Sequence, residues 1–269
     1  MPYQAELQAA FDAAQLAGQK LRELYERFKA IPNAPADIST EADRQSQEII
    51  LKLIREKFPG DALCAEEETP SLAGVPRIGP RLWIVDPIDG TRGFARKNGE
   101  FSVMIGFVHD KRPVVGVVLE PAKDRVTYAV AGGGCWRRDG GGEAQRSSVT
   151  ATTELSAVTL TQSHSRDPNK RSKEVTALNP ARVIETYSAG IKLAQVARGE
   201  ADMYLNTYEN FHDWDIAAGH VLVAEAGGTA TGLKGQELRY GEEGAWQRYG
   251  LLGTNGKIHA AAVAALAHV

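Results

Sequence analysis

Two stretches at the beginning of the chain carry apolar residues at helical spacing. The first covers residues 7–28 and ends before Pro32, which has no backbone N–H with which to continue a helix. The second begins at residues 40–43, whose Thr-Glu-Ala-Asp sequence is typical of a capping box, and ends at residues 59–60. This pattern predicts two amphipathic helices, each with one buried face.

The next part of the chain changes to short apolar runs that are separated by turn residues, which is the pattern of β-strands. The turn at residues 109–112 is short enough to join two of these strands as an antiparallel hairpin. Helices that precede an antiparallel sheet in this way indicate an α+β arrangement. The predicted strands cover residues 61–65, 82–85, 101–108, 113–119 and 125–131.

After the glycine-rich stretch 132–142, predicted strands alternate with predicted helices, as in α/β units. The strands are predicted at residues 157–162, 182–186, 201–205 and 249–253, and the helices at residues 170–178, 190–198, 214–226 and 257–267. We therefore predict a layered sandwich with an α+β part over residues 1–153 and an α/β part over residues 154–269.

The charge of the chain bears on its partners. A formal net charge of -3 gives no general positive field that would attract nucleic acid or an anionic membrane, so we expect neither as a partner. The N-terminus lacks the basic start and apolar run of a signal peptide, which favours a cytoplasmic protein. Cys64 and Cys135 have no metal-ligand spacing and are predicted to be buried free thiols.

Two aspartates directly follow a predicted buried strand. Asp86 and Asp89 lie in the turn 86–91, in which Pro87 fixes one φ angle and Gly90 permits unusual backbone angles. Two carboxylates held on one side of a tight bend repel each other unless a cation lies between them, and such oxygen ligands suit Mg²⁺. The alternative is an ordinary exposed turn. The strand that runs into the acids favours the metal site.

Other acids could complete this site. The run Glu66 to Glu68 ends a predicted strand, where adjacent acids repel one another without a metal, although a solvated loop is an equal alternative. Asp215 begins a predicted helix and Asp43 is the acid of the predicted capping box, so each has an ordinary local explanation. The spacing of Asp86 and Asp89 differs from that of phosphatases that form a phospho-aspartate, and the chain has no P-loop sequence. The combination favours hydrolysis assisted by metal ions.

Together these motifs resemble the lithium-sensitive, Mg²⁺-dependent phosphatases of the inositol monophosphatase superfamily. Their pattern is an upstream Asp, a Glu-Glu pair, a DP[IL]DGT turn and a late WDxxAG. The corresponding residues here are Asp43, Glu66-Glu67, Asp86 to Thr91 and Trp214 to Gly219. The resemblance implies an αβαβα sandwich of the sugar-phosphatase type and a phosphatase that acts on a small phosphorylated metabolite.

Within the superfamily, the sequence after the turn is similar to the bacterial 3'(2'),5'-bisphosphate nucleotidases. Gly93-Phe94 and residues 98–101 match their DGT[KR]GF and NGEF patterns, whereas inositol monophosphatases usually continue DGTxNF. Residues 163–167 are also similar, and Lys192 matches a lysine near the second phosphate of the nucleotide. His164 could equally be an ordinary loop histidine, and Lys192 a lysine on the surface of a helix. The chain departs from the nucleotidase pattern at three positions, which leaves the substrate open: Glu68, Arg92 and Ala189.

The resemblance also implies roles for individual residues. Two or three Mg²⁺ ions would be held by carboxylates and one backbone carbonyl: Glu66, Asp86 and the Ile88 carbonyl for one ion, Asp86, Asp89 and Asp215 for a second, and Glu66 near a third. Asp43 and Thr91 would orient a water that the ion at Glu66 activates. The N–H groups of Gly90 and Thr91 would hold the phosphate, and His164 and Lys192 would contact the rest of the substrate.

The expected reaction is hydrolysis of 3'-phosphoadenosine 5'-phosphate to AMP and phosphate. The nearest alternative is an inositol, sugar or histidinol monophosphatase that uses the same metal site. A more distant one is a non-catalytic protein whose acids bind a structural cation. The sequence leaves open whether the protein is a monomer or a homodimer.

Overall fold

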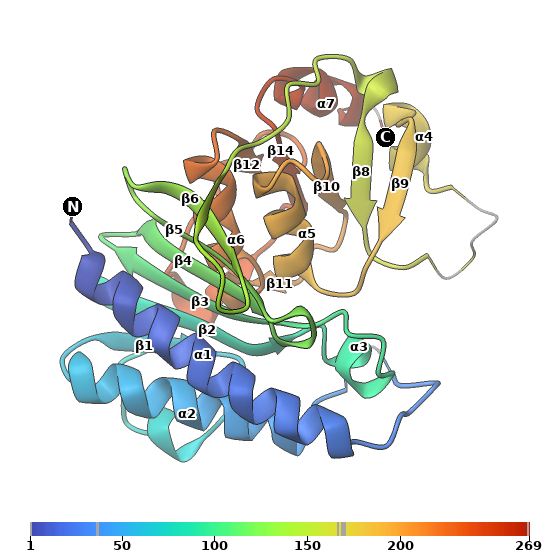
Figure 1. Cartoon of the computed structure of the whole chain (residues 1–269). Coiled ribbons are helices and arrows are strands. Elements are labelled where there is room, and N and C mark those ends of the chain that lie inside the picture. Colours follow the sequence, from blue (N-terminus) through green and yellow to red (C-terminus); the bar gives the residue numbers. More distant parts are fainter. Residues whose placement is uncertain (1, 36–37, 166, 168–170, 268) are drawn as a thin grey trace.

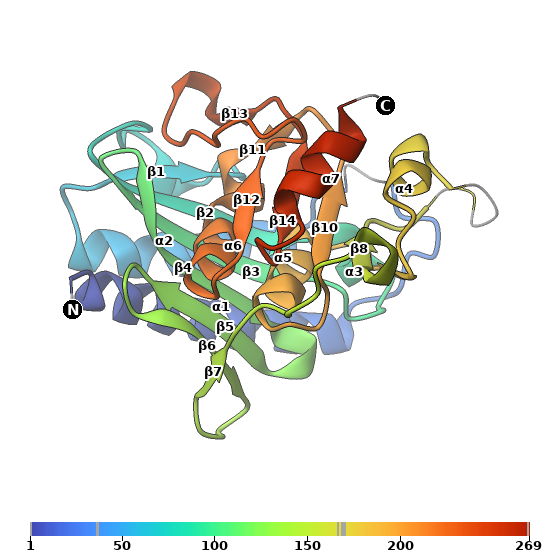
Figure 2. The ribbon, with the colours of Figure 1, turned by 90° about the horizontal axis from the view of Figure 1, so that it is seen from above.

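Helices and sheets alternate in five layers in the computed structural model, which describes residues 2–35, 38–165, 167, 171–267 and 269 (Figure 1). The first helical layer consists of α1 (Gln4–Arg27) and α2 (Glu41–Lys57), the middle layer of α5 (Ala189–Ala197) and α6 (Asp213–Glu225), and the outer layer of α4 (Lys173–Leu178) and α7 (His259–Leu266). A seven-stranded sheet separates the first two helical layers and a five-stranded sheet separates the last two (Figure 2). The predicted αβαβα sandwich is confirmed.

The larger sheet follows the order of the chain, and only its first pair of strands is parallel. Its strands are β1 (Ala62–Ala65), β2 (Arg81–Asp89), β3 (Ser102–His109), β4 (Arg112–Glu120), β5 (Arg125–Val130), β6 (Gly134–Asp139) and β7 (Gln145–Ser147). The predicted hairpin is confirmed as the antiparallel pair β3 and β4. Strand β6 lies inside the glycine-rich stretch, where the sequence pattern did not indicate a strand, because it is short and glycines flank it.

The smaller sheet has the order β12-β14-β10-β8-β9 and is parallel only across its last three strands. Its strands are β8 (Thr159–Gln162), β9 (Arg182–Glu185), β10 (Met203–Asn206), β12 (Thr229–Thr231) and β14 (Leu251–Thr254). A separate ribbon pairs β11 (Phe211–His212) with β13 (Trp246–Gln247). Strands β11, β12 and β13 were not predicted, since two or three residues are too few to show a period. Residue 170 of a predicted helix and residue 166 of the stretch 163–167 lie outside the described residues.

The connection between β7 and β8 contains the predicted boundary at residues 153 and 154. Helices α5 and α6 come from the second half of the chain, yet they pack in one hydrophobic cluster with strands of both sheets. The division into two parts stays a prediction. Both cysteines are free and buried, as predicted. None of the helices in the described part of the chain is long and apolar enough to cross a membrane.

Helix α6 approaches the larger sheet closely because glycine occupies its contact point. A Cβ atom at Gly116 on β4 would lie 2.2 Å from the backbone oxygen of Ala218 and 3.0 Å from Cβ of Val221. Only glycine leaves room there for the backbone of the helix. The absence of a side chain at Gly116 therefore sets the distance between α6 and the sheet.

We expect Gly116→Ala to lower the free energy of unfolding by about 2 kcal/mol, because the added methyl group must push α6 away from β4. Urea denaturation measures this effect. The matched control is Gly141→Ala, since a Cβ atom at Gly141 would have no neighbour within 4 Å. Equal stability of the two variants would show that α6 does not need the space at Gly116.

Candidate active site

Acidic side chains from four elements meet at one edge of the larger sheet. Strands β1 and β2 are parallel, so their carboxyl ends lie at the same edge, and the N–H of Glu66 after β1 donates to the Val85 carbonyl on β2 at 3.3 Å. The acids form two groups whose ligand atoms lie within 4.8 Å of one another: Asp43, Glu66 and Glu67, and Asp86, Asp89 and Asp215. The structure therefore brings together the five acids that the sequence analysis named as ligands or water-orienting groups.

The end of β2 is irregular, which turns the two aspartates of the strand toward this edge. The register with β3 shifts between Asp86 and Asp89. Gly90 follows with φ of 85°, and a Cβ atom there would lie 2.7 Å from the Glu100 carbonyl oxygen. Both the angle and the lack of space require glycine. A short helix, α3 (Thr91–Ala95), begins directly after it.

The predicted capping box of α2 is present and also reaches the turn after β2. One oxygen of Asp43, Oδ2, accepts the N–H of Thr40 at 2.8 Å. The other, Oδ1, lies 2.9 Å from the hydroxyl of Thr91, which also lies 2.9 Å from the Ile88 carbonyl oxygen. Burial raises the pKa of Asp43 to about 6, although hydrogen bonds from Thr40 and Thr91 oppose this rise. The two residues expected to orient water are thus in contact.

Burial and mutual repulsion disfavour the charged forms of these carboxyl groups in the absence of a cation. Asp86 is 2% exposed, and burial, followed by the charges of Glu66 and Asp89, raises its pKa well above the ordinary value. Glu66 is the exposed member of the cluster, and partial desolvation followed by the charge of Asp215 raises its pKa to about 8. Burial raises the pKa of Asp215 to about 7, with a further contribution from Asp89. A cation among these oxygens would reverse all three effects.

One oxygen of this cluster has no partner within the described part of the chain. Asp86 Oδ1 is buried and no hydrogen-bond donor reaches it. A buried carboxylate oxygen without a hydrogen-bond partner lowers the stability of the fold, and binding to a hard divalent cation would remove this penalty. The residues present therefore fit a metal ion, and Asp86 is placed between the other acids of both groups.

Asp89 is held by the N-terminal end of α5, a contact that the sequence analysis missed. Its Oδ1 accepts the N–H of Ala189 at 3.1 Å, and its Oδ2 accepts the N–H of Gly190 at 2.6 Å and the hydroxyl of Ser188. The hydroxyl of Ser102 on β3 lies 3.3 Å from Oδ2. Ser188 is the N-cap of α5, so a serine before an apolar helix was the signal. The contact between Ser188 and Asp89 could not be predicted from the sequence.

Lys192 and His164 both contact the segment that precedes α5. Lys192 is 1% exposed and is not a surface lysine, because its Nζ donates to Ser163 Oγ at 2.9 Å and to the carbonyls of Thr186 and Tyr187 at 3.0 and 3.2 Å. Burial lowers its pKa to about 8. The Nε2 atom of His164 lies 2.7 Å from Glu100 Oε2, and its ring lies 4.3 Å from that of Tyr187.

An open pocket of about 400 Å³ lies at the ends of β8 and β10, and Ser163, Ser165, Arg171 and Asn206 are among the residues that line it. Because Ser163 also accepts Nζ of Lys192, the buried ammonium lies directly behind the wall of this pocket.

The sequence analysis also missed an aromatic stack beside Asp215. The N–H of His212 donates to Asp215 Oδ2 at 2.6 Å, while its ring packs 4.2 Å from Trp214 and 4.0 Å from Trp246. The signal for this stack was the His-Asp-Trp-Asp sequence that contains the metal-site motif.

Comparison with known proteins agrees with this site. The chain matches the Inositol monophosphatase family over residues 3–269. It is 35% identical to a fructose-1,6-bisphosphatase/inositol-1-monophosphatase of Thermotoga maritima over 75% of this chain and 73% of that protein. It is 30% identical to the 3'(2'),5'-bisphosphate nucleotidase CysQ of Escherichia coli over 84% of this chain and 90% of that protein. The solved inositol monophosphatase from Anabaena (Nostoc) sp. PCC 7120 superposes with a TM-score of 0.80 at 30% identity, covering 100% of this chain and 98% of that one.

Fold and site together define a phosphatase that acts on small phosphorylated substrates. The chain belongs to the inositol monophosphatase family. Enzymes of this family use Mg²⁺ in general, and the two groups of acids could bind it. The identity with nucleotidases and with inositol monophosphatases is similar, so the family is shown and the particular substrate is a separate question.

Proposed function

We propose that the protein hydrolyses 3'-phosphoadenosine 5'-phosphate to AMP and phosphate, using a water that Mg²⁺ activates. The observation that carries the phosphatase chemistry is the buried, unpartnered Oδ1 of Asp86 among the other acids. Glu66, Asp86 and the Ile88 carbonyl would hold one ion, and Asp86, Asp89 and Asp215 a second, with a third near Glu66. When bound, the ions would lower the pKa of water and neutralise charge on the leaving oxygen.

The side chains around the metal ligands would position the reactants. If a cation bound the Ile88 carbonyl, the hydroxyl of Thr91 would donate its hydrogen bond to Asp43 Oδ1, which lies 2.9 Å away. The oxygen of Thr91 would then accept a hydrogen bond from the attacking water and orient it toward phosphorus. The N–H groups of Gly90 and Thr91, at the start of α3, would hold the phosphate oxygens.

A buried ammonium beside the pocket supports a substrate with two phosphates. Lys192 donates to Ser163, and Ser163 lines the open pocket together with Arg171. A phosphate oxygen that replaces the hydroxyl of Ser163 would form a charge-assisted hydrogen bond with Lys192. His164 would contact the nucleoside from the other side of the segment. The 30% identity to the CysQ nucleotidase agrees with this substrate.

A second candidate is an inositol or sugar monophosphate at the same metal site. It is favoured by 30% identity to human inositol monophosphatase 2. The Thermotoga maritima enzyme, at 35% identity, is named for an inositol monophosphate and also for a sugar bisphosphate, so it agrees with either candidate. A histidinol phosphate belongs to the same class. These substrates have no second phosphate, so Lys192 would add nothing to their recognition.

We expect Lys192→Met to lower kcat/KM for 3'-phosphoadenosine 5'-phosphate about 30-fold or more, because a hydrogen bond between two charged groups is lost. The comparison substrate is 3'-AMP, which has the same scissile ester and no 5'-phosphate. Its kcat/KM should change less than about threefold. Phosphate release from both substrates is measured for both proteins.

The matched control is Lys173→Met, since Lys173 is exposed on α4. It should leave both rates unchanged. Equal losses for the two substrates in Lys192→Met would contradict a phosphate contact and would assign Lys192 to the folding of the segment before α5. Faster hydrolysis of inositol 1-phosphate than of either nucleotide by the wild-type protein would favour the second candidate.

A further inference from the structure

Helix α5 joins the acid site to a buried ion pair at its opposite end. At the N-terminal end, Ser188 and the first two N–H groups of the helix hold Asp89. At the C-terminal end, the helix is capped by Arg198, whose side chain is 1% exposed. A nine-residue helix is about 13 Å long, so the two ends belong to different surroundings.

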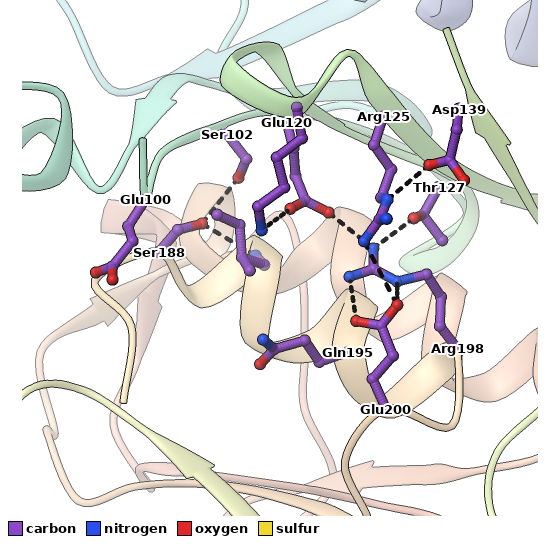
Figure 3. A network of polar contacts seen from close by, with 12 residues as sticks. Glu100, Ser102, Glu120, Arg125, Thr127, Asp139, Ser188, Gln195, Arg198 and Glu200 are labelled. Carbon is purple, nitrogen blue, oxygen red and sulfur yellow. Dashed lines mark hydrogen bonds and ion pairs between the residues drawn. The ribbon is translucent and has the colours of Figure 1, made fainter. Parts of the chain in front are cut away.

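The guanidinium of Arg198 donates four hydrogen bonds, from all three of its nitrogens (Figure 3). Its Nη1 donates to Glu120 Oε1 and to Thr127 Oγ1, each at 2.8 Å, while Nε and Nη2 donate to the two carboxylate oxygens of Glu200, also at 2.8 Å. Glu120 is completely buried, and its second oxygen accepts Nζ of Lys123 at 2.8 Å. Each nitrogen of Arg198 and each carboxylate oxygen of Glu120 therefore has a hydrogen-bond partner.

Both ends of α5 are attached to the same sheet. Asp89 ends β2, Glu120 ends β4, and β3 pairs with both strands between them. Eight of the nine residues of α5 are buried, so the helix has little room to move without moving its neighbours. Because so short a helix moves as a unit, releasing its C-terminal end from Glu120 would also change how its N-terminal donors meet Asp89.

A contribution to stability does not by itself explain the buried pair of Arg198 and Glu120. A buried ion pair loses so much hydration that apolar residues of similar volume are often as stable. What such a pair does supply is one fixed geometry, because the fork of arginine accepts few arrangements of its partners. The contacts between the N-terminal end of α5 and Asp89 indicate that the fixed geometry is needed at Asp89.

We propose that Arg198 and Glu120 form a latch that holds α5 in the position from which it orients the carboxylate of Asp89 for a divalent cation. Both are positioning residues that act through the helix and touch neither cation nor substrate. This inference rests on the proposed role of Asp89 as a metal ligand. It predicts that the latch affects metal affinity more than it affects folding.

The test is the double variant Arg198→Met with Glu120→Leu, which removes both charges and leaves neither one buried alone. Glu200 keeps Arg125 and Arg137 as charged neighbours, at 3.5 and 3.7 Å. Isothermal titration of the protein with MgCl₂ in the absence of substrate should show a roughly tenfold weaker Kd than for the wild-type protein. Urea denaturation should remain cooperative.

A matched control removes ion pairs at the opposite end of the same sheet. Arg81 on β2 donates to Asp61 at 2.7 and 3.0 Å and to Glu6 on α1 at 2.9 Å, so the triple variant Arg81→Met, Asp61→Asn and Glu6→Gln removes all three charges together. It should leave the Kd for Mg²⁺ unchanged even where the variant is less stable. Should the latch double variant fail to fold, Arg198→Lys, which keeps the charge and loses the fork, should show the same direction of change in Kd.

The outcomes separate the latch from the proposed function. A wild-type protein that binds Mg²⁺ and a folded latch variant that binds it equally well would overturn the latch and leave the metal site standing. A wild-type protein that binds no Mg²⁺ would overturn the proposed function and the latch with it. A Kd that weakens equally in the latch and control variants would show that loss of stability, and not the position of α5, weakens binding.

Discussion

Replacement of Asp215 by asparagine is expected to lower kcat by at least about a thousandfold while the protein remains folded. The substitution removes one negative charge from the group formed by Asp86, Asp89 and Asp215, which is the proposed site of the second ion. The amide oxygen of asparagine can still accept the N–H of His212, which now donates to Asp215 at 2.6 Å. Phosphate release in saturating Mg²⁺ gives kcat, and urea denaturation gives the free energy of unfolding.

The control for this experiment is Glu68→Gln. Glu68 belongs to the same acidic run as Glu66, but it is exposed and pairs with Arg77 at 2.8 Å. It should keep its kcat within about twofold, as expected for an exposed pair. If Asp215→Asn retained near-normal turnover, Asp215 would not be a metal ligand, and the second ion would have to be assigned elsewhere.

The stability of the metal-free protein should fall as pH rises, and Mg²⁺ should remove most of this fall. Burial raises the pKa of Asp215 to about 7 and that of Asp86 well above its ordinary value, whereas in the unfolded chain both are about 4. Between these values the folded protein binds more protons than the unfolded chain, so the free energy of unfolding decreases with increasing pH. From pH 6.5 to 8.0 in EDTA, Tm should drop by roughly 2 to 5 °C.

Three histidines oppose this fall at the lower end of the window. Burial lowers the pKa of His212, His220 and His259, so their contribution to stability rises with pH until the unfolded chain has lost these protons, at about pH 7. Saturating MgCl₂ should raise Tm most at pH 8.0, where the carboxylates are charged and bind the cation. Thermal melts at the two pH values, with EDTA and with MgCl₂, test this. A Tm in EDTA that rises across the window would contradict the cluster of buried acids.

Local signals in the sequence predicted the parts of the site that lie close together along the chain. The capping box placed Asp43 at the start of a helix, and the predicted turn 86–91 placed Asp86 and Asp89 on one bend. In the structure β2 continues to Asp89, and the bend is an irregularity in its pairing with β3. The layered fold followed from the period of the apolar residues. Contacts between these segments came from the family resemblance, because spacing along the chain does not show which strand ends meet.

Long-range contacts account for what the sequence did not show. Asp89 and Ser188 are 99 residues apart, and Arg198 and Glu120 are 78 residues apart. Lys192 illustrates the same limit, since one lysine at the start of a helix suits a surface as well as a core. Its burial follows from the carbonyls of Thr186 and Tyr187, which supply acceptors only when the chain turns back before α5.

The most direct test of the account is phosphate release from 3'-phosphoadenosine 5'-phosphate and from inositol 1-phosphate, measured side by side with Mg²⁺ and with EDTA. We expect release in Mg²⁺, with the higher kcat/KM for the nucleotide, and no release in EDTA. Preference for the inositol ester would keep the metal chemistry and refute the proposed substrate. Undiminished release in EDTA would contradict the central claim that the clustered acids act through bound metal ions.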